Sequence, residues 1–143
     1  MNKKTGFQER RKARRYALQA LYAWALSNNP LSEIETYFLI EHHEDSYDKE
    51  YFHTLLHEVP ANLEEIERIM SPYLSRNLED LGPIELSILR LSVFELTKRL
   101  EIPYKVVINE GLELGKRFAS PDSHKFINGV LDKVAKEIRS LEM

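Results

Sequence analysis

The segment from Gly82 to Leu100 carries two apolar stripes with helical spacing, and this pattern restricts the fold more than any other feature. One stripe consists of Leu86, Leu89, Val93, Leu96 and Leu100, and the other of Ile84, Ile88 and Leu91. A helix that is apolar on two sides has to be covered on two sides. The segment therefore predicts a central helix, opened by Gly82 and by Pro83 at its first position, with other helices packed around it.

Start signals mark six further helices along the chain. They are the capping-box spacings Thr5 with Gln8 and Ser32 with Glu35, then Asp48, Asn62 with Glu65 after a break at Pro60, Pro103, and the stretch Ser120 to Ser123. The nearest approach to a strand is Val106 to Ile108, but its flanks keep a helical period, so we expect a helix there. Gly111 and Gly115 stand four apart and would let a neighbouring helix approach closely. The sequence predicts an all-α fold of about seven helices.

Charge is distributed unevenly along the chain. Among the first fifteen residues, the basic side chains are Lys3, Lys4, Arg10, Arg11, Lys12, Arg14 and Arg15, and the one acid is Glu9. A helix dipole disfavours cations at its N-terminus by about 0.3–1 kcal/mol each. An external polyanion would offset that repulsion, and a nucleic-acid backbone is the commonest one.

Two simpler explanations of the basic start remain open. A cleaved targeting peptide would also be rich in arginine, but Ala13, Ala17 and Leu21 continue the helical pattern directly out of the basic run. The other explanation is a solvated, charged helix face.

The segment from Glu33 to Glu67 has the opposite sign, with eleven acids against Lys49 alone. Such an acidic surface is expected either to bind a basic protein partner or simply to face solvent.

Several functional classes have little support in the sequence. The chain has no cysteine, which removes disulfides, thiolate metal sites and cysteine nucleophiles. It also lacks an apolar run of membrane-spanning length, so we expect a soluble, cytoplasmic protein. His53 and His57 have the spacing of a zinc-protease helix, but Thr54 stands where the catalytic glutamate would be. No phosphate-binding glycine loop is present, and we predict no enzyme, no cofactor and no metal site.

Two pairs of residues suit exposed nucleic-acid bases. Tyr73 lies close to Arg76 in an irregular segment, and Lys125 precedes Phe126 near the start of the last helix. Proteins bind single-stranded RNA by stacking bases on aromatic or guanidinium planes and by holding the backbone with cations. Core packing or a solvated edge is the simpler explanation of each pair taken alone. Asp122, with the polar residues after it, would in the same simple explanation only cap the last helix.

Four ordered blocks of sequence resemble the NusB family over nearly the full length of the chain. They are Arg10 to Arg14 leading into Gln19 to Tyr22, Pro72 to Arg76, Pro103 to Val106 with Ile108 to Glu110, and Asp122 to Phe126 followed by Asn128 to Lys133. The resemblance implies two packed helical bundles that form one compact domain over residues 1–143, with halves of roughly 1–75 and 76–143.

The resemblance also implies a function and its partners. Members of the family bind boxA RNA together with NusE, a small-subunit ribosomal protein, and they catalyse no reaction. With other Nus factors, they act on RNA polymerase to keep it elongating through terminators. The RNA contacts it implies are Arg10, Arg11, Lys12, Arg14, Gln19, Tyr73, Arg76, Glu85, Asp122, Lys125 and Phe126, and Tyr22 would face the protein partner.

The sequence departs from the family pattern at two places. Arg15 and Tyr16 follow the arginine motif where we expect an acid and a small residue, and Gly111 with Gly115 replaces alanines. We further hypothesise that Glu85 and Asp122 select the RNA sequence, because an acid facing RNA is tolerated only where it accepts hydrogen bonds from base amino groups.

Alternative functions remain at this point. NusB-like helical domains also occur fused to ribosomal RNA cytosine methyltransferases, although this chain has neither a cysteine nor a glycine-rich cofactor loop. A helical adaptor that binds only protein is the third possibility. The free protein could be a monomer or a homodimer, because a face left for NusE could also serve self-association.

Overall fold

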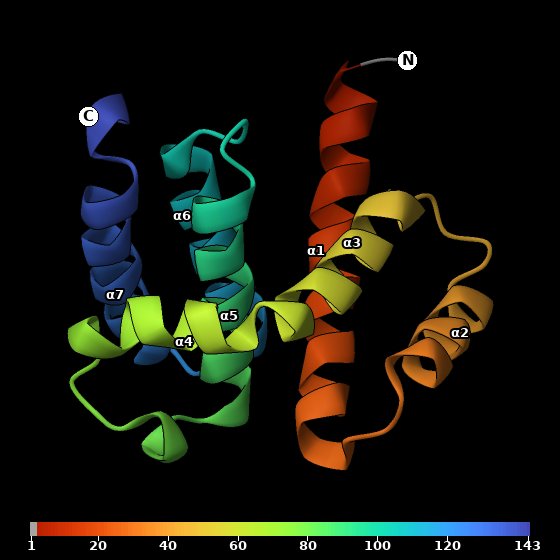
Figure 1. Ribbon diagram of the computed structural model, residues 1–143. Helices are drawn as coiled ribbons and strands as arrows, with labels where there is room; N and C mark the ends of the chain where they lie inside the picture. The colour runs from red at the N-terminus through yellow and green to blue at the C-terminus, as the bar shows by residue number, and fades with distance from the viewer. Residues whose placement is uncertain (1–2) are drawn as a thin grey trace. The chain divides into compact units, whose positions relative to one another are not determined.

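Helices make up most of the chain in a computed structural model that describes residues 3–143 (Figure 1). The α-helices are α1 (Lys3–Ser27), α2 (Leu31–Glu41), α3 (Lys49–Ala61), α4 (Leu63–Met70), α5 (Pro83–Lys98), α6 (Tyr104–Phe118) and α7 (Ser123–Ile138). Three short 3₁₀ helices are η1 (Ser71–Tyr73), η2 (Leu78–Asp80) and η3 (Ser140–Glu142). Residues 3–143 contain no strand, so the all-α prediction is confirmed. The side chains of Lys3, Lys4 and Thr5 lie outside what the structure describes.

The chain divides into two compact units, Met1–Ala61 and Asn62–Met143. The boundary between these units precedes α4, which packs against α5 and α7, whereas the family resemblance implied halves that divide near residue 75. In the first unit, α1 packs mainly against α3, which crosses it in Figure 1. Ala13, Ala17 and Ala20 are fully buried on α1. These small side chains leave room for the large buried residues Phe52, Leu55 and Leu56 of α3.

Helix α5 is the centre of the second unit and contacts α4, α6 and α7. Both predicted stripes contribute to the core, since Leu89 and Val93 of one and Ile88 and Leu91 of the other are fully buried. Leu100 is the exception: it lies beyond the end of α5 and is 62% exposed. The prediction that Leu100 extends the stripe is therefore wrong.

A glycine allows the close approach of helices in this unit. A Cβ atom added to Gly111 of α6 would lie 2.8 Å from Oγ of Ser92 and 2.9 Å from Cδ1 of Leu131. Because both distances are below 3.0 Å, a side chain at position 111 would force Ser92 or Leu131 to shift, so the glycine favours the close packing of α6 on α5 and α7. The predicted packing role of Gly111 is confirmed.

Arg139 binds the C-terminal end of α5, just before the position at which Leu100 leaves the helix and its apolar stripe. Its buried guanidinium donates from Nε to the carbonyl oxygen of Leu96 at 2.8 Å and from Nη1 to that of Ile102 at 2.9 Å. The Nη2 group also reaches the carbonyl oxygen of Glu95 at 3.3 Å. The last carbonyl groups of a helix lack partners within the helix. Here Arg139, at the end of α7, donates to the carbonyl of Leu96, whereas that of Glu95 also accepts the N–H of Arg99.

The helix starts were predicted with mixed success. Asp48 caps α3 as expected, because its Oδ1 accepts the N–H of Tyr51 at 3.0 Å. Helix α1 already includes Lys3, so Thr5 is not its cap, and α2 begins after Pro30, so the box at Ser32 is also wrong. Pro60 lies inside the last turn of α3 rather than breaking it. A proline this close to a helix end removes only one late hydrogen bond.

Candidate nucleic-acid interface

The basic residues at the start of α1 are partly neutralised by acids of their own unit. Nζ of Lys12 lies 2.8 Å from Oδ1 of Asp45, and Nε of Arg10 lies 3.2 Å from Oδ2 of Asp48. Both acids belong to the connection between α2 and α3. Because α1 begins at Lys3, Arg10 and Lys12 lie beyond its first turn, where the helix dipole acts. Their charges are balanced by these two acids within the chain, which the charge pattern alone did not reveal.

Tyr16, one of the two departures from the family motif, also binds Asp45. Its hydroxyl donates a short hydrogen bond to Oδ2 of Asp45. Burial and this hydrogen bond raise the pKa of Tyr16 to about 12. The hydrogen bonds from Lys12 and Tyr16 lower the pKa of Asp45 to about 2. Asp45 therefore stays ionised, and through Lys12 and Tyr16 it holds the connection between α2 and α3 against α1.

The remaining predicted RNA contacts of α1 differ in exposure. Arg14 is buried, with 3% of its surface exposed, and its guanidinium lies 5.6 Å from the centroid of the Tyr51 ring. Such a side chain offers little surface to a phosphate, and its role as an RNA contact stays a prediction. Arg11 lies over the exposed ring of Phe7, 5.3 Å from its centroid. Gln19 donates from Nε2 to the carbonyl oxygen of Arg15 at 3.2 Å.

In the second unit, Arg76 joins the first turns of α5 and α7. Its guanidinium carbon lies 4.6 Å from the centroid of the Phe126 ring, and its Nη2 lies 3.7 Å from Oε1 of Glu85. Glu85 is largely buried and also accepts the N–H of Gly82 at 3.4 Å, so it stabilises the start of α5. Three of the predicted RNA contacts, which are distant from one another in the sequence, therefore meet in one cluster.

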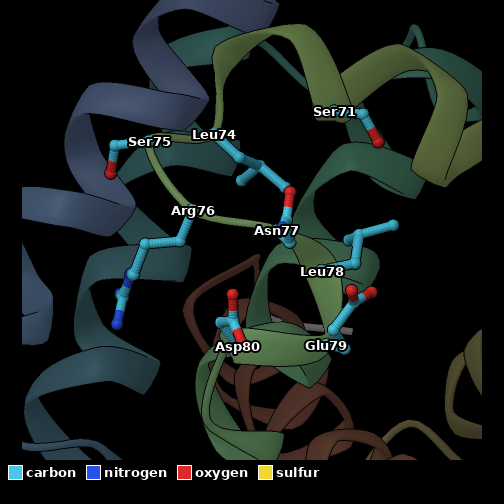
Figure 2. Close-up of a pocket in the computed structure, with 8 residues that line it drawn as sticks. All are labelled: Ser71, Leu74, Ser75, Arg76, Asn77, Leu78, Glu79 and Asp80. Atoms are coloured by element: carbon cyan, nitrogen blue, oxygen red, sulfur yellow. The ribbon is translucent and has the colours of Figure 1, made fainter.

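The segment from Ser71 to Asp80, which carries Arg76, borders an open pocket of about 610 Å³. Arg76 lies on the opposite side of this segment from Leu78 and Glu79 in Figure 2. The pocket lining is mostly polar. It offers space beside the arginine for a group larger than a water molecule.

Tyr73 and Arg76 contact different parts of α7. The hydroxyl of Tyr73 donates to Oε1 of Glu137 at 2.5 Å, and this hydrogen bond raises the pKa of Tyr73. Glu137 and Phe126 are eleven residues apart on α7, which corresponds to a rise of about 16 Å. Arg76 therefore pairs with Phe126, and Tyr73 pairs with Glu137, while Lys125 remains the neighbour of Phe126 in the sequence.

Asp122 and Lys125 complete the cluster at the start of α7. Both are exposed, and with Phe126 they occupy positions i, i+3 and i+4, which lie on one helix face. Asp122 stands at the N-cap position, yet within the described chain its side chain makes no capping hydrogen bond. The simple explanation of Asp122 as a cap is therefore wrong.

Tyr22 lines an apolar groove in the first unit, between the end of α1 and α2. The groove measures about 610 Å³, and its lining includes Leu26, Ile34, Tyr37 and Phe38. Leu26 and Tyr37 are each 61% exposed. Exposed apolar side chains gathered around a groove are typical of protein-binding surfaces.

One group of side chains among residues 3–143 has the composition and spacing of metal ligands. It consists of Glu35 on α2 and of His53 and His57 on α3, with ligand atoms within 4.8 Å of one another. Burial raises the pKa of Glu35, but the hydrogen bonds from both histidines outweigh it and hold that pKa below its usual range. The sequence prediction missed this group because Glu35 is far from the histidines along the chain.

No helix in the described residues is long and apolar enough to span a membrane.

Known proteins resemble this chain over most of its length. A model of the NusB family matches residues 11–136. The transcription antitermination protein NusB of Sodalis glossinidius (strain morsitans) is 52% identical over 130 residues, which cover 91% of this chain and 94% of that protein. NusB of Pseudomonas savastanoi pv. phaseolicola (strain 1448A / Race 6) is 50% identical over 135 residues, covering 94% of this chain and 82% of that protein.

Solved structures give the same result. NusB of T. maritima superposes with a TM-score of 0.80 at 31% identity, covering 92% of this chain and 94% of that one. A crystal structure of the antitermination factors NusB and NusE with double-stranded RNA superposes with a TM-score of 0.81 at 31% identity, covering 91% of this chain and 98% of that one. Sequence and fold thus agree over nearly the whole length, and the chain belongs to the NusB family.

Proposed function

We propose that the chain binds boxA RNA together with NusE and acts as a transcription antitermination factor on ribosomal RNA transcripts. Relatives that are half identical carry the name transcription antitermination protein, and a NusB with a similar fold was crystallised with NusE and RNA. In this role the protein would meet RNA polymerase and the other Nus factors through the transcript. Its place of action would be the cytoplasm, where the transcript is made.

The cluster around Arg76 and Phe126 is the observation that carries the RNA-binding part of the proposal. The Arg76 guanidinium lies against the Phe126 ring, and Lys125 and Asp122 are exposed beside that ring. An exposed base would stack on this aromatic and guanidinium pair, which contributes about 1–3 kcal/mol per base. Lys125 and the N–H groups at the start of α7 would hold the adjacent phosphate.

The basic segment of α1 would supply further phosphate contacts through Arg10, Arg11 and Lys12. Arg10 and Lys12 already bind Asp48 and Asp45. An arginine has five N–H donors and a lysine has three, so each retains donors for a phosphate oxygen. Arg14 is left out of this set because it is buried, and its role would be to hold α1 against Tyr51.

Sequence selectivity would come from Asp122 rather than from Glu85. Glu85 is largely buried and its carboxylate is occupied by Gly82 and Arg76. Asp122 is exposed and makes no capping hydrogen bond within the described chain, so it would accept hydrogen bonds from base amino groups. In Asp122→Asn, both the affinity for boxA and the preference over scrambled RNA should change. Unchanged binding to both RNAs would refute this role.

NusE would bind at the apolar groove lined by Tyr22, Leu26 and Tyr37. Acidic side chains of the α2 region, such as Glu33 at the groove and Glu41 at the end of the helix, would add attraction for a basic ribosomal protein. The same groove would account for a homodimer of the free protein, with NusE and a second copy competing for it.

The proposed role is one of binding, with no reaction catalysed, and one experiment separates it from the alternatives. The chain is mixed with NusE and a boxA oligonucleotide and passed through a sizing column. A ternary complex is expected. A complex with NusE that excludes the RNA would instead favour a protein-binding adaptor, and a complex with neither would refute the proposal.

A further inference from the structure

We propose that Glu35, His53 and His57 bind one divalent transition-metal ion that joins α2 to α3. This inference goes beyond the RNA-binding function and does not depend on it. It rests on three side chains of the first unit that belong neither to the basic segment of α1 nor to the apolar groove.

The three side chains come together from two helices. His53 and His57 are four residues apart on α3 and so lie one turn apart on the same face, with ring centroids 4.3 Å apart. Glu35 reaches them from α2 with both of its carboxylate oxygens. Oε2 lies 2.6 Å from Nδ1 of His53, and Oε1 lies 2.8 Å from Nε2 of His57.

The ligand types favour a transition metal over calcium or magnesium. Two imidazoles with one carboxylate suit Zn²⁺ and its neighbours in the first row, whereas Ca²⁺ and Mg²⁺ prefer sites made of oxygen alone. Zn²⁺ binds nitrogen and oxygen ligands at about 2.0–2.2 Å, which places the ligand atoms of a tetrahedral site about 3.3–3.5 Å apart. The two separations between carboxylate and imidazole are shorter than this by less than about 1 Å, and all three ligand atoms lie within 4.8 Å of one another. Rotations of the side chains would therefore bring the three ligand atoms to the distances that the ion requires.

Exposure supports an ion that enters from solvent. The side chain of His53 is 58% exposed and that of His57 is 32% exposed, while that of Glu35 is only 16% exposed. The carboxylate is therefore the least accessible of the three ligands, and an ion would approach from the side of the more exposed His53 ring. Three protein ligands would leave one position of the ion open to water.

The alternative is that the three side chains form only a hydrogen-bonded group, with a proton where the ion would be. The test is a calorimetric titration of the full chain with Zn²⁺ at neutral pH. We expect one ion per chain and an affinity at least tenfold weaker in His57→Ala. His43→Ala is the matched control, since His43 is an exposed histidine 3.6 Å from the carboxylate of Glu44, and it should bind Zn²⁺ as the unmodified chain does.

A second pair of measurements keeps the test independent of folding. His53→Gln changes an exposed side chain, and Glu35→Gln keeps the size of the carboxylate. Both should retain the helical circular dichroism spectrum and both should bind Zn²⁺ less tightly. Zn²⁺ should also raise the melting temperature of the unmodified chain, because an ion that binds only the folded state stabilises it, and should raise that of His57→Ala much less.

The results that would overturn the proposal are equally definite. If the unmodified chain takes up no Zn²⁺ at 100-fold molar excess of the ion over protein, the group is only hydrogen-bonded. If His57→Ala and Glu35→Gln bind Zn²⁺ as tightly as His43→Ala does, the ion is held elsewhere. Binding of boxA RNA should be the same in all four variants, so either proposal can fail without the other.

Discussion

The guanidinium of Arg76 lies against the ring of Phe126, with its carbon 4.6 Å from the ring centroid. The two residues are distant in the sequence, and they bring together the segment between η1 and η2 and the first turn of α7. Glu85, 3.7 Å from Arg76, holds the same guanidinium from α5. Stacking on one side and ion pairing on the other fix the orientation of the arginine before any RNA arrives.

Phe126→Leu should weaken binding of boxA RNA about tenfold or more. Leucine keeps an apolar side chain but has no aromatic face, and loss of a stacked base costs about 1–3 kcal/mol. Phe126→Tyr retains the ring and is the control. Fluorescence anisotropy with labelled boxA RNA measures both, and equal affinities for the two variants would show that no base stacks on this ring.

Arg11→Gln should reduce the salt dependence of RNA binding. Each phosphate neutralised on a single strand contributes about 0.7 to the slope of log affinity against log salt concentration, so the slope should fall by about that amount. Arg68→Gln, at an exposed arginine of α4 outside the predicted contacts, should leave the slope unchanged. Identical slopes for the two variants would remove Arg11 from the interface.

Leu26→Asp should weaken the binding of NusE at least tenfold, because it places a charge at the rim of the apolar groove lined by Tyr22. Leu141→Asp is matched to it, since Leu141 is also an exposed leucine but lies in η3. Calorimetric titration of each variant with NusE gives the comparison. Retained affinity in Leu26→Asp would place the partner on another surface.

Asp45→Asn should destabilise the protein at neutral pH, and the effect should shrink in acid. The pKa of Asp45 is lowered from 3.8 to about 2 in the folded protein, so its contribution is present above about pH 4 and is lost as the pH falls toward 2. Urea unfolding at a series of pH values measures the difference. Asp132→Asn, which removes an exposed carboxylate 3.4 Å from Lys136, should show a much smaller effect, and a pH-independent loss in Asp45→Asn would contradict the assignment.

Most of the fold could be predicted because its signals are local. The apolar period of α5, the proline at its first position and the capping aspartate of α3 each act within a few residues. The errors arose where tertiary contacts override local preference. Glu35 was expected to complete a capping box at the start of α2, but it binds two histidines of α3 instead. Arg139 ends α5 through contacts that no local pattern reveals.

The site was predicted as a set of residues but not as an arrangement. Charge alone cannot distinguish Arg11, which lies over the exposed Phe7 ring, from Arg14, which is buried. Likewise, sequence proximity paired Arg76 with Tyr73, whereas packing pairs Arg76 with Phe126. The acids that neutralise α1 lie in a connection more than thirty residues away, and only the folded chain brings them together.

The most direct test of the RNA-binding function is an equilibrium binding measurement with the complex of this chain and NusE. Its affinity for boxA RNA is compared with that for a scrambled RNA of equal length and composition at physiological salt. We predict that boxA binds at least tenfold more tightly. Equal affinities for the two RNAs would contradict the account, because phosphate contacts alone would then explain all of the binding.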